Sequence, residues 1–247
     1  MLKPASPLAP PPVRRDATYE NIGYLLLTLL AVVVFGFYRT YFGLFPAFKG
    51  ITTVQHLHGM LMLSWFGLLI VQPFLIKHRR LGLHRVLGRV SYGLVPLLLL
   101  SMWFVTRGGF LRQAAELPLA VNIGGLALNL PSLPAFAALF GLAMYYRKNR
   151  AYHMRYMVAT ALLLLGPGLG RAGILYIGLP FPVAVEWALG LTDALAAGLL
   201  LSDVVRRQPL RPYLVALTIV LAMHLVWEAR MMAPWQAFGG FVAQLFF

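Results

Sequence analysis

Seven long apolar stretches, separated by short arginine-rich turns, constrain this chain more than any other feature. Each is close to the roughly 20 apolar residues that an α-helix needs to cross about 30 Å of hydrocarbon. In lipid the backbone must satisfy its own hydrogen bonds, which favours helices throughout. We therefore predict an all-α polytopic membrane protein, a seven-transmembrane-helix bundle with spans at residues 22–42, 53–76, 84–106, 126–146, 153–178, 181–203 and 212–232.

The composition agrees with lipid as the solvent. Of the 247 residues, 60% are hydrophobic and 11% are charged, whereas soluble domains are about 45–50% apolar and about 25% charged. A formal net charge of +14 would favour nucleic acid in a soluble protein, but the basic residues are confined to loop ends, so no nucleic-acid partner is expected. The chain has no cysteine, which excludes disulfides, thiolate metal sites and iron–sulfur clusters.

The basic residues also predict the orientation. Fifteen of the 21 Lys and Arg fall on one side of the predicted spans, the side that the positive-inside rule assigns to the cytoplasm. The N-terminus is then cytoplasmic and the C-terminus outside, in a bacterial cytoplasmic (inner) membrane. Residues 1–21 are expected to be a disordered Pro-rich cytoplasmic tail, 22–232 the membrane domain and 233–247 a short C-terminal interfacial segment. Residues 107–125 are expected to form a surface loop, either without regular structure or with an interfacial helix.

Ionisable groups within the spans are the first candidates for function, because charge inside a bilayer is costly. On the outer side, His58 lies near the start of the second span, and His224 and Glu228 share a face of the seventh. Glu186 and Asp193 share a face of the sixth. At 1.5 Å per residue, His58, Glu186 and His224 are expected at similar depths.

Three interpretations of this outer group are open. In the first, His58 and His224 are the axial ligands of a b-type haem. In the second, an intramembrane enzyme uses zinc or iron to activate water, and its metal ligands are His58, His224, Glu186 and Glu228. In the third, the groups bond one another in a transporter or a non-catalytic membrane-complex subunit, where a polar path is lined by Arg171, Glu186 and Asp193.

A second pair of histidines lies on the predicted cytoplasmic side. His84 begins the third span and His153 the fifth, each beside arginine. Their equal depth allows an optional second haem. Its propionates, or alternatively anionic lipid headgroups, would be held by Arg85, Arg89 and Arg155. Gln72 is expected either to line a quinone pocket or only to pack between helices.

Two segments carry a resemblance to a known family. They read HLHGMLMLSWFGLLIVQPFLIKHRRLGLHRVLGRVSY (56–92) and HMRYMVATALLLLGPGLGR (153–171). Together they resemble an uncharacterised family of bacterial multi-pass membrane proteins with the pattern HxHG…HRxLGR…HxR. The likeness covers the second, third and fifth spans and implies membership without a biochemical activity. The glycines at 166–170 also predict a break or a close helix approach in the fifth span.

A looser, architectural similarity is to the dihaem cytochrome b membrane reductases. It implies histidine pairs near both faces of a helical bundle, although this chain lacks the pair of histidines across one helix that many dihaem proteins have. The leading prediction is therefore a haem-binding redox protein that passes electrons through or along the membrane, with a quinol or another redox protein as its partner. Whether the chain is an enzyme is left open.

Overall fold

The computed structural model describes residues 17–247, in which the regular structure is helical and no strand occurs. The helices are α1 (Ala17–Phe37), α2 (Thr53–Lys77), α3 (Leu81–Gln113), α4 (Leu119–Asn129), α5 (Ser132–Tyr145), α6 (Arg150–Leu163), α7 (Leu165–Ala172), α8 (Phe181–Val205), α9 (Arg211–Glu228) and α10 (Ala233–Phe246). Three short turns join them, namely the 3-10 turns η1 (Phe42–Leu44) and η3 (Ala229–Met231) and the π-helical turn η2 (Gly173–Ile177).

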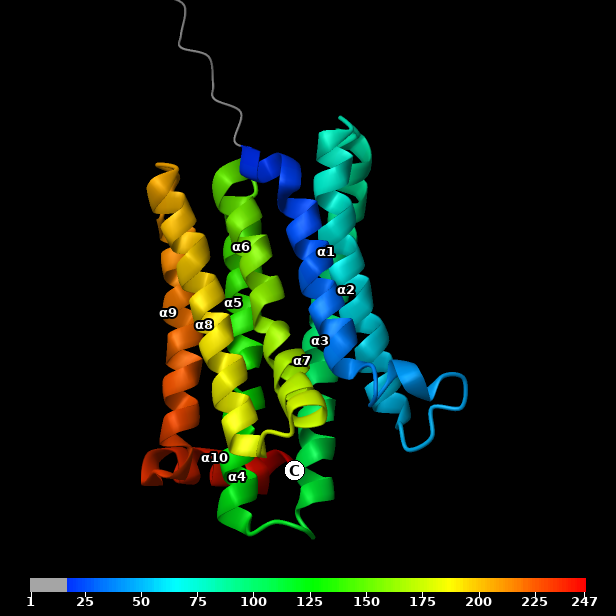
Figure 1. The fold of residues 1–247 in the computed structure, drawn as a ribbon, viewed down its shortest axis with the longest axis vertical. Helices are drawn as coiled ribbons and strands as arrows, with labels where there is room; N and C mark the ends of the chain where they lie inside the picture. Colours follow the sequence, from blue (N-terminus) through cyan, green and yellow to red (C-terminus); the bar gives the residue numbers. More distant parts are fainter. Residues whose placement is uncertain (1–16) are drawn as a thin grey trace, which may run out of the picture.

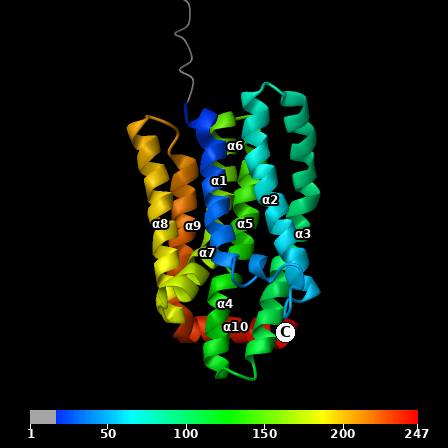
Figure 2. The same ribbon diagram turned by 45° about the vertical axis from the view of Figure 1, so that its right-hand side comes forward.

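Within residues 17–247, six helical segments are long and apolar enough to cross a bilayer. They are Thr53–Lys77, Leu81–Gln113, Leu119–Tyr145, Arg150–Ile177, Phe181–Val205 and Arg211–Met231. The prediction of an all-α, multi-pass membrane protein is confirmed at this level. The apolar part of α1, Asn21–Phe37, is shorter, although α1 runs beside the other helices and α10 lies across one end of the bundle (Figures 1 and 2).

Two predicted boundaries need correction. Of the expected N-terminal tail, residues 1–16 lie outside the described part, while the chain is already helical from Ala17. The surface loop expected at 107–125 is wrong for most of its length, because α3 continues to Gln113 and only 114–118 link it to α4. The side-chain amide of Asn122 donates to the Phe110 carbonyl at 3.0 Å. This buried contact between α3 and α4 offsets the roughly 1 kcal/mol by which each glycine at 108–109 weakens a helix.

Local sequence signals determine where several helices begin. At α2 the Thr52 hydroxyl accepts from the Gln55 backbone N–H, and the Gln55 side chain accepts from the Thr52 N–H, which together form a capping box. Asn149 caps α6 by accepting from a backbone N–H. Pro182 and Pro212 stand in the first turns of α8 and α9, where a missing N–H costs no hydrogen bond.

The core lies where α2, α3, α5 and α6 meet. The rings of Trp65 and Phe136 are 5.4 Å apart, both are fully buried, and the Trp65 indole N–H donates to the Thr160 hydroxyl at 3.3 Å. The most enclosed span is Arg150–Ile177, of which 56% is buried, against 17–39% for the other five. α2 and α3 form one side of the bundle, and α8 and α9 form the opposite side (Figures 1 and 2).

The fifth predicted span is broken at its glycine-rich segment. α6 ends at Leu163 and α7 begins at Leu165, so that Pro167 falls in a first turn, where proline is tolerated. Gly168 lies directly against α1, since a Cβ built on Gly36 would come within 2.1 Å of the Gly168 carbonyl oxygen. Pro167 therefore accounts for the break, and Gly168 provides the close approach, that the sequence predicted for this segment.

Candidate functional site

Two imidazoles come together at the arginine-rich end of the bundle. His84 is the fourth residue of α3 and His153 the fourth residue of α6. Their rings lie within electrostatic range of each other, and His84 also lies beside the backbone of Gln72 on α2. Two spans distant in sequence thus contribute their histidines to one cluster, which we call the inner histidine cluster (Gln72, His84 and His153).

The ring of His153 is held in one orientation. Its Nδ1 lies 2.8 Å from the backbone carbonyl oxygen of Ala143 on α5. Because a carbonyl oxygen only accepts, Nδ1 carries the proton and donates, which leaves the lone pair of Nε2 free. Histidines that ligate metals commonly donate their second ring N–H to a backbone carbonyl in this way. The orientation of His153 is therefore suited to ligation through Nε2.

Two other atoms of the inner histidine cluster are buried without a hydrogen-bond partner in the described structure. They are Nδ1 of His84 and Oε1 of Gln72. Gln72 is 9% exposed, and it packs beside Gly88 of α3, since its Nε2 lies 3.7 Å from where a Cβ on that glycine would stand. Unpartnered buried polar atoms are uncommon, and together they give this cluster unused capacity to bind a ligand.

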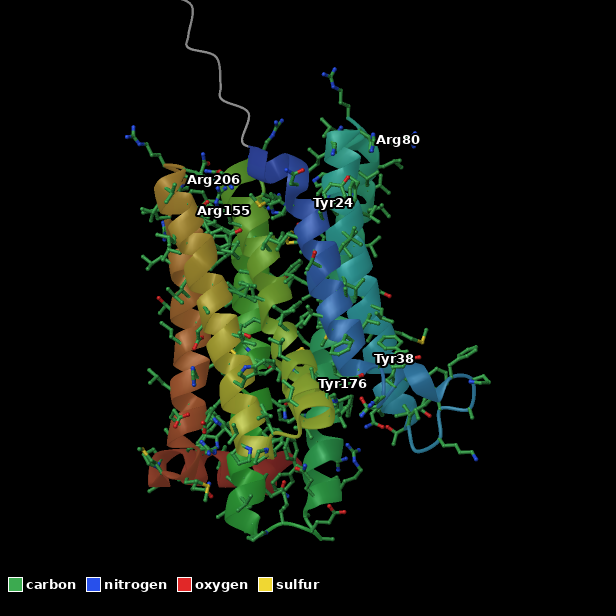
Figure 3. All side chains as sticks on the ribbon, in the orientation of Figure 1. Tyr24, Tyr38, Arg80, Arg155, Tyr176 and Arg206 are labelled. Atoms are coloured by element: carbon green, nitrogen blue, oxygen red, sulfur yellow. The ribbon has the colours of Figure 1, made fainter. Side chains whose placement is uncertain are left out.

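The predicted anion-binding role of Arg155 is not supported by its contacts. Its Nε and Nη2 donate to the two carboxylate oxygens of Asp203 at 2.6 and 2.8 Å, and Nη1 donates to the Ala151 carbonyl. The arginine side chain is 0% exposed. Arg155 shares its end of the bundle with Arg80 and Arg206 (Figure 3), but its charge is already neutralised. Arg85 and Arg89 remain exposed there.

The outer pair does not converge. Nδ1 of His58 lies 3.0 Å from the Ser101 hydroxyl, a contact between α2 and α3. Nδ1 of His224 lies 2.6 Å from Oδ2 of Asp193, a contact between α9 and α8. These two helix pairs lie on opposite sides of the bundle (Figures 1 and 2). The sequence predicted only that His58 and His224 lie at a similar depth in the bundle. The structure does not place them close enough to bind one ion.

The structure does not support the four-ligand zinc or iron site. Within residues 17–247, no group of three or more His, Cys, Asp or Glu side chains is arranged to hold a metal ion. Glu186 is exposed on α8, and Glu228, with its carboxylate 3.9 Å from Nε2 of His224, is 53% exposed. Of the four predicted ligands, His58 is paired with Ser101, and His224 lies beside Glu228 and Asp193, while Glu186 joins neither group.

Sequence reasoning missed two partner residues. Asp203 was not singled out, although it is one of only seven acidic residues in the chain and lies in a predicted span. Tyr41 was not considered either. Its hydroxyl lies 2.9 Å from Nδ1 of His56 and 3.3 Å from where a Cβ on Gly59 would stand. In the HLHG segment, His56 and Gly59 therefore accommodate Tyr41, while His58 contacts α3.

No known protein family, no curated protein and no solved structure matches this chain. The resemblance to an uncharacterised bacterial membrane family therefore stays a prediction, and the function must be argued from the geometry.

Proposed function

We propose that this chain is an integral membrane redox protein that binds one b-type haem between His84 and His153. The observation that carries the proposal is the electrostatic interaction between two imidazoles from separate helices, one of them with its Nε2 free. Paired imidazoles from facing helices are a standard way to hold haem iron. When bound, the haem supplies the one-electron chemistry, while the chain supplies axial nitrogens and an apolar surround.

The residues around the inner histidine cluster fit such a group. The exposed guanidinium groups of Arg85 and Arg89 lie on the same first turns of α3 as His84 and suit the charge of propionates, or of anionic lipid phosphates at the same surface. Towards the middle of the bundle, Tyr156 and Leu139 belong to the buried core. A haem site needs apolar side chains around the porphyrin ring and positive charge near its propionates.

We propose a seven-span topology with a cytoplasmic N-terminus and an external C-terminus, in the inner membrane of a bacterium. In this assignment α1 is the first span. Support comes from Arg80, Arg155 and Arg206, which share one end of the bundle (Figure 3), as the positive-inside rule requires. The inner histidine cluster then lies near the cytoplasmic surface.

A quinol is the redox partner that we propose. A cavity of about 510 Å³ lies near the cytoplasmic end of α2, and it is lined by Val71, Phe74, Leu75, His78 and Arg80. Apolar walls with a few polar groups at the rim are typical of small-molecule sites. The walls suit a quinone ring and tail, and His78 and Arg80 supply hydrogen bonds for its oxygens.

The test is the visible absorption spectrum of detergent-purified protein, expressed with a haem precursor in the medium. We expect a Soret band and the sharp α band of low-spin haem with two imidazole ligands. Both His84→Ala and His153→Ala should lose the low-spin spectrum, since each removes one axial nitrogen. His78→Ala is the matched control, because His78 is exposed in the same turn and should leave the spectrum unchanged.

A colourless wild-type protein that stays folded and monodisperse with excess haem would refute the proposal. So would an unchanged spectrum in both His84→Ala and His153→Ala. If His58→Ala and His224→Ala lost the spectrum while His84→Ala and His153→Ala kept it, the haem ligands would be His58 and His224, and the proposal of His84 and His153 would be overturned.

A second function, proton transfer along α8 and α9, is favoured by a different observation. Asp193, His224 and Glu228 form a chain whose exposure rises from 16% at Asp193 through 27% to 53% at Glu228. Oδ1 of Asp193 is buried without a partner in the described structure. In liposomes with an imposed pH gradient, Asp193→Asn should slow proton flux at least about tenfold, as expected for an intramembrane carboxylate in a relay. Equal flux in wild type and variant would exclude this function.

A further inference from the structure

We infer that Arg171 is the cation of an oxyanion-binding site in the outer half of the bundle, a site that does not depend on the proposed haem. Arg171 is near the end of α7, six residues before its span ends at Ile177. At 1.5 Å per residue it therefore lies about 9 Å inside that end. The ligand is a phosphate or carboxylate group, which presents two oxygens to the planar fork of a guanidinium.

No carboxylate in the described part of the chain neutralises Arg171. The ion pairs there join Asp203 to Arg155, and Asp193 and Glu228 to His224. A guanidinium has five N–H donors, and one from Arg171 reaches the backbone carbonyl of Pro167 at 3.2 Å. An uncompensated cation within a span is costly, and such residues usually serve binding or transport.

Two neighbouring side chains shape the site. The guanidinium carbon of Arg171 lies 4.3 Å from the centre of the Phe37 ring on α1, a contact that orients the fork and leaves its edge free to bind oxygens. His58 lies within electrostatic range of Arg171. The Ser101 hydroxyl donates to a backbone carbonyl at 2.7 Å, so Nδ1 of His58 must donate to Ser101. The neutral ring therefore carries its one proton on Nδ1, so that His58 adds no second positive charge beside Arg171 and the guanidinium alone donates to the anion.

The oxyanion has two possible sources. A phospholipid phosphate of the outer leaflet can be reached from this depth, because a long arginine side chain extends towards the interface. A dissolved phosphate can reach the same fork from the end of the bundle. The arginine side chain is half-buried, so neither source needs the helices to separate.

The experiment measures the thermal unfolding of detergent-purified protein by tryptophan fluorescence. Dioleoylphosphatidylglycerol and sodium phosphate are titrated separately, with dioleoylglycerol as the lipid that lacks the phosphate. A ligand that binds the native state raises Tm with concentration. We expect at least one phosphate-bearing probe to raise Tm while dioleoylglycerol does not, and we expect Arg171→Gln to weaken the apparent affinity at least about tenfold. Protection by phosphatidylglycerol alone identifies a lipid as the source, and protection by both probes identifies a site open to water.

Two further variants keep the test decisive. Arg112→Gln removes an exposed arginine in the last turn of α3 and should keep the wild-type affinity. Should Arg171→Gln fail to fold, Arg171→Lys keeps the charge without the fork, and we expect about threefold weaker binding. The inference is overturned if neither phosphate probe raises Tm, or if folded Arg171 variants respond like wild type. Neither result depends on whether haem binds at His84 and His153.

Discussion

Arg155 and Asp203 form a bidentate ion pair that is almost fully enclosed, with distances of 2.6 Å from Nε to Oδ2 and 2.8 Å from Nη2 to Oδ1. The pair joins α6, the most enclosed span, to α8 on the flank of the bundle. Gln208 accepts from the same guanidinium at 3.4 Å, and the guanidinium carbon lies 5.9 Å from the centre of the Tyr213 ring on α9. One arginine therefore connects three spans at the arginine-rich end of the bundle.

Breaking this pair should destabilise the protein strongly. Asp203→Asn leaves the guanidinium of Arg155 buried without a neutralising charge, and removing one partner of a buried pair typically costs about 3–5 kcal/mol. The free energy of unfolding, measured by denaturant titration in mixed micelles, should fall by that amount. Lys148→Gln is the control, since Lys148 is exposed in a loop and should change stability by less than about 0.5 kcal/mol.

The double variant Arg155→Met/Asp203→Leu separates charge from packing. Replacing both partners by apolar side chains removes the stranded charge, and such replacements are often neutral or stabilising. We expect the double variant to recover most of the stability lost in Asp203→Asn. A double variant as unstable as the single one would show that the pair acts through shape and not through charge compensation.

The contact between Gly36 and Gly168 makes a separate prediction. Gly36→Ala places a methyl group 2.1 Å from the Gly168 carbonyl oxygen, so α1 and α7 must move apart. Overpacking of this kind typically costs about 1–3 kcal/mol. Gly93→Ala in α3 is the matched control, because nothing lies within 4 Å of its added Cβ, and alanine should stabilise the helix by up to about 1 kcal/mol. Equal stability of the two variants would contradict the close approach of these helices.

The hydrogen bond between Tyr41 and His56 makes a prediction of smaller size, at the start of α2. Tyr41→Phe removes the hydroxyl that lies 2.9 Å from Nδ1 of His56 but keeps the ring, which contacts the rings of Phe42 and Phe48. A partly buried hydrogen bond contributes about 1 kcal/mol net. We expect Tm to fall by a few degrees in Tyr41→Phe, and by less when the same change is made in a His56→Ala background, where the hydroxyl has lost its ring nitrogen; His56→Ala by itself also removes the packing of the imidazole on the Phe48 ring. Additive losses would mean that the two residues act independently.

The sequence was sufficient to predict an all-α, multi-pass membrane protein, because the length of an apolar stretch decides whether it can cross a bilayer. It was sufficient for the break near Pro167, where glycine and proline act locally. It could not predict that α3 continues through Gly108 and Gly109, since the side-chain contact from Asn122 that supports this turn comes from another helix. Where a helix end depends on contacts with another helix, the sequence around that end does not predict its position.

In the candidate site, too, the sequence predicted some features and not others. The depth of a residue follows from its position in a span, so His84 and His153 could be matched at one level. The order of helices around the bundle does not follow from depth, and for that reason His58 and His224 were grouped although their helices lie on opposite sides (Figures 1 and 2). Arg155 was misassigned because its partner, Asp203, is 48 residues away in sequence.

The proposed topology can be tested with single cysteines, because the chain contains none. Lys49→Cys lies in the loop between α1 and α2, and Lys148→Cys lies in the turn between α5 and α6; both positions are exposed. If α1 spans the membrane and the basic turns are cytoplasmic, a membrane-impermeant maleimide should label Lys49→Cys in intact cells. It should label Lys148→Cys only after the membrane is opened. Labelling of Lys148→Cys alone in intact cells would invert the proposed orientation, and labelling of both before opening would require a different arrangement of spans between them.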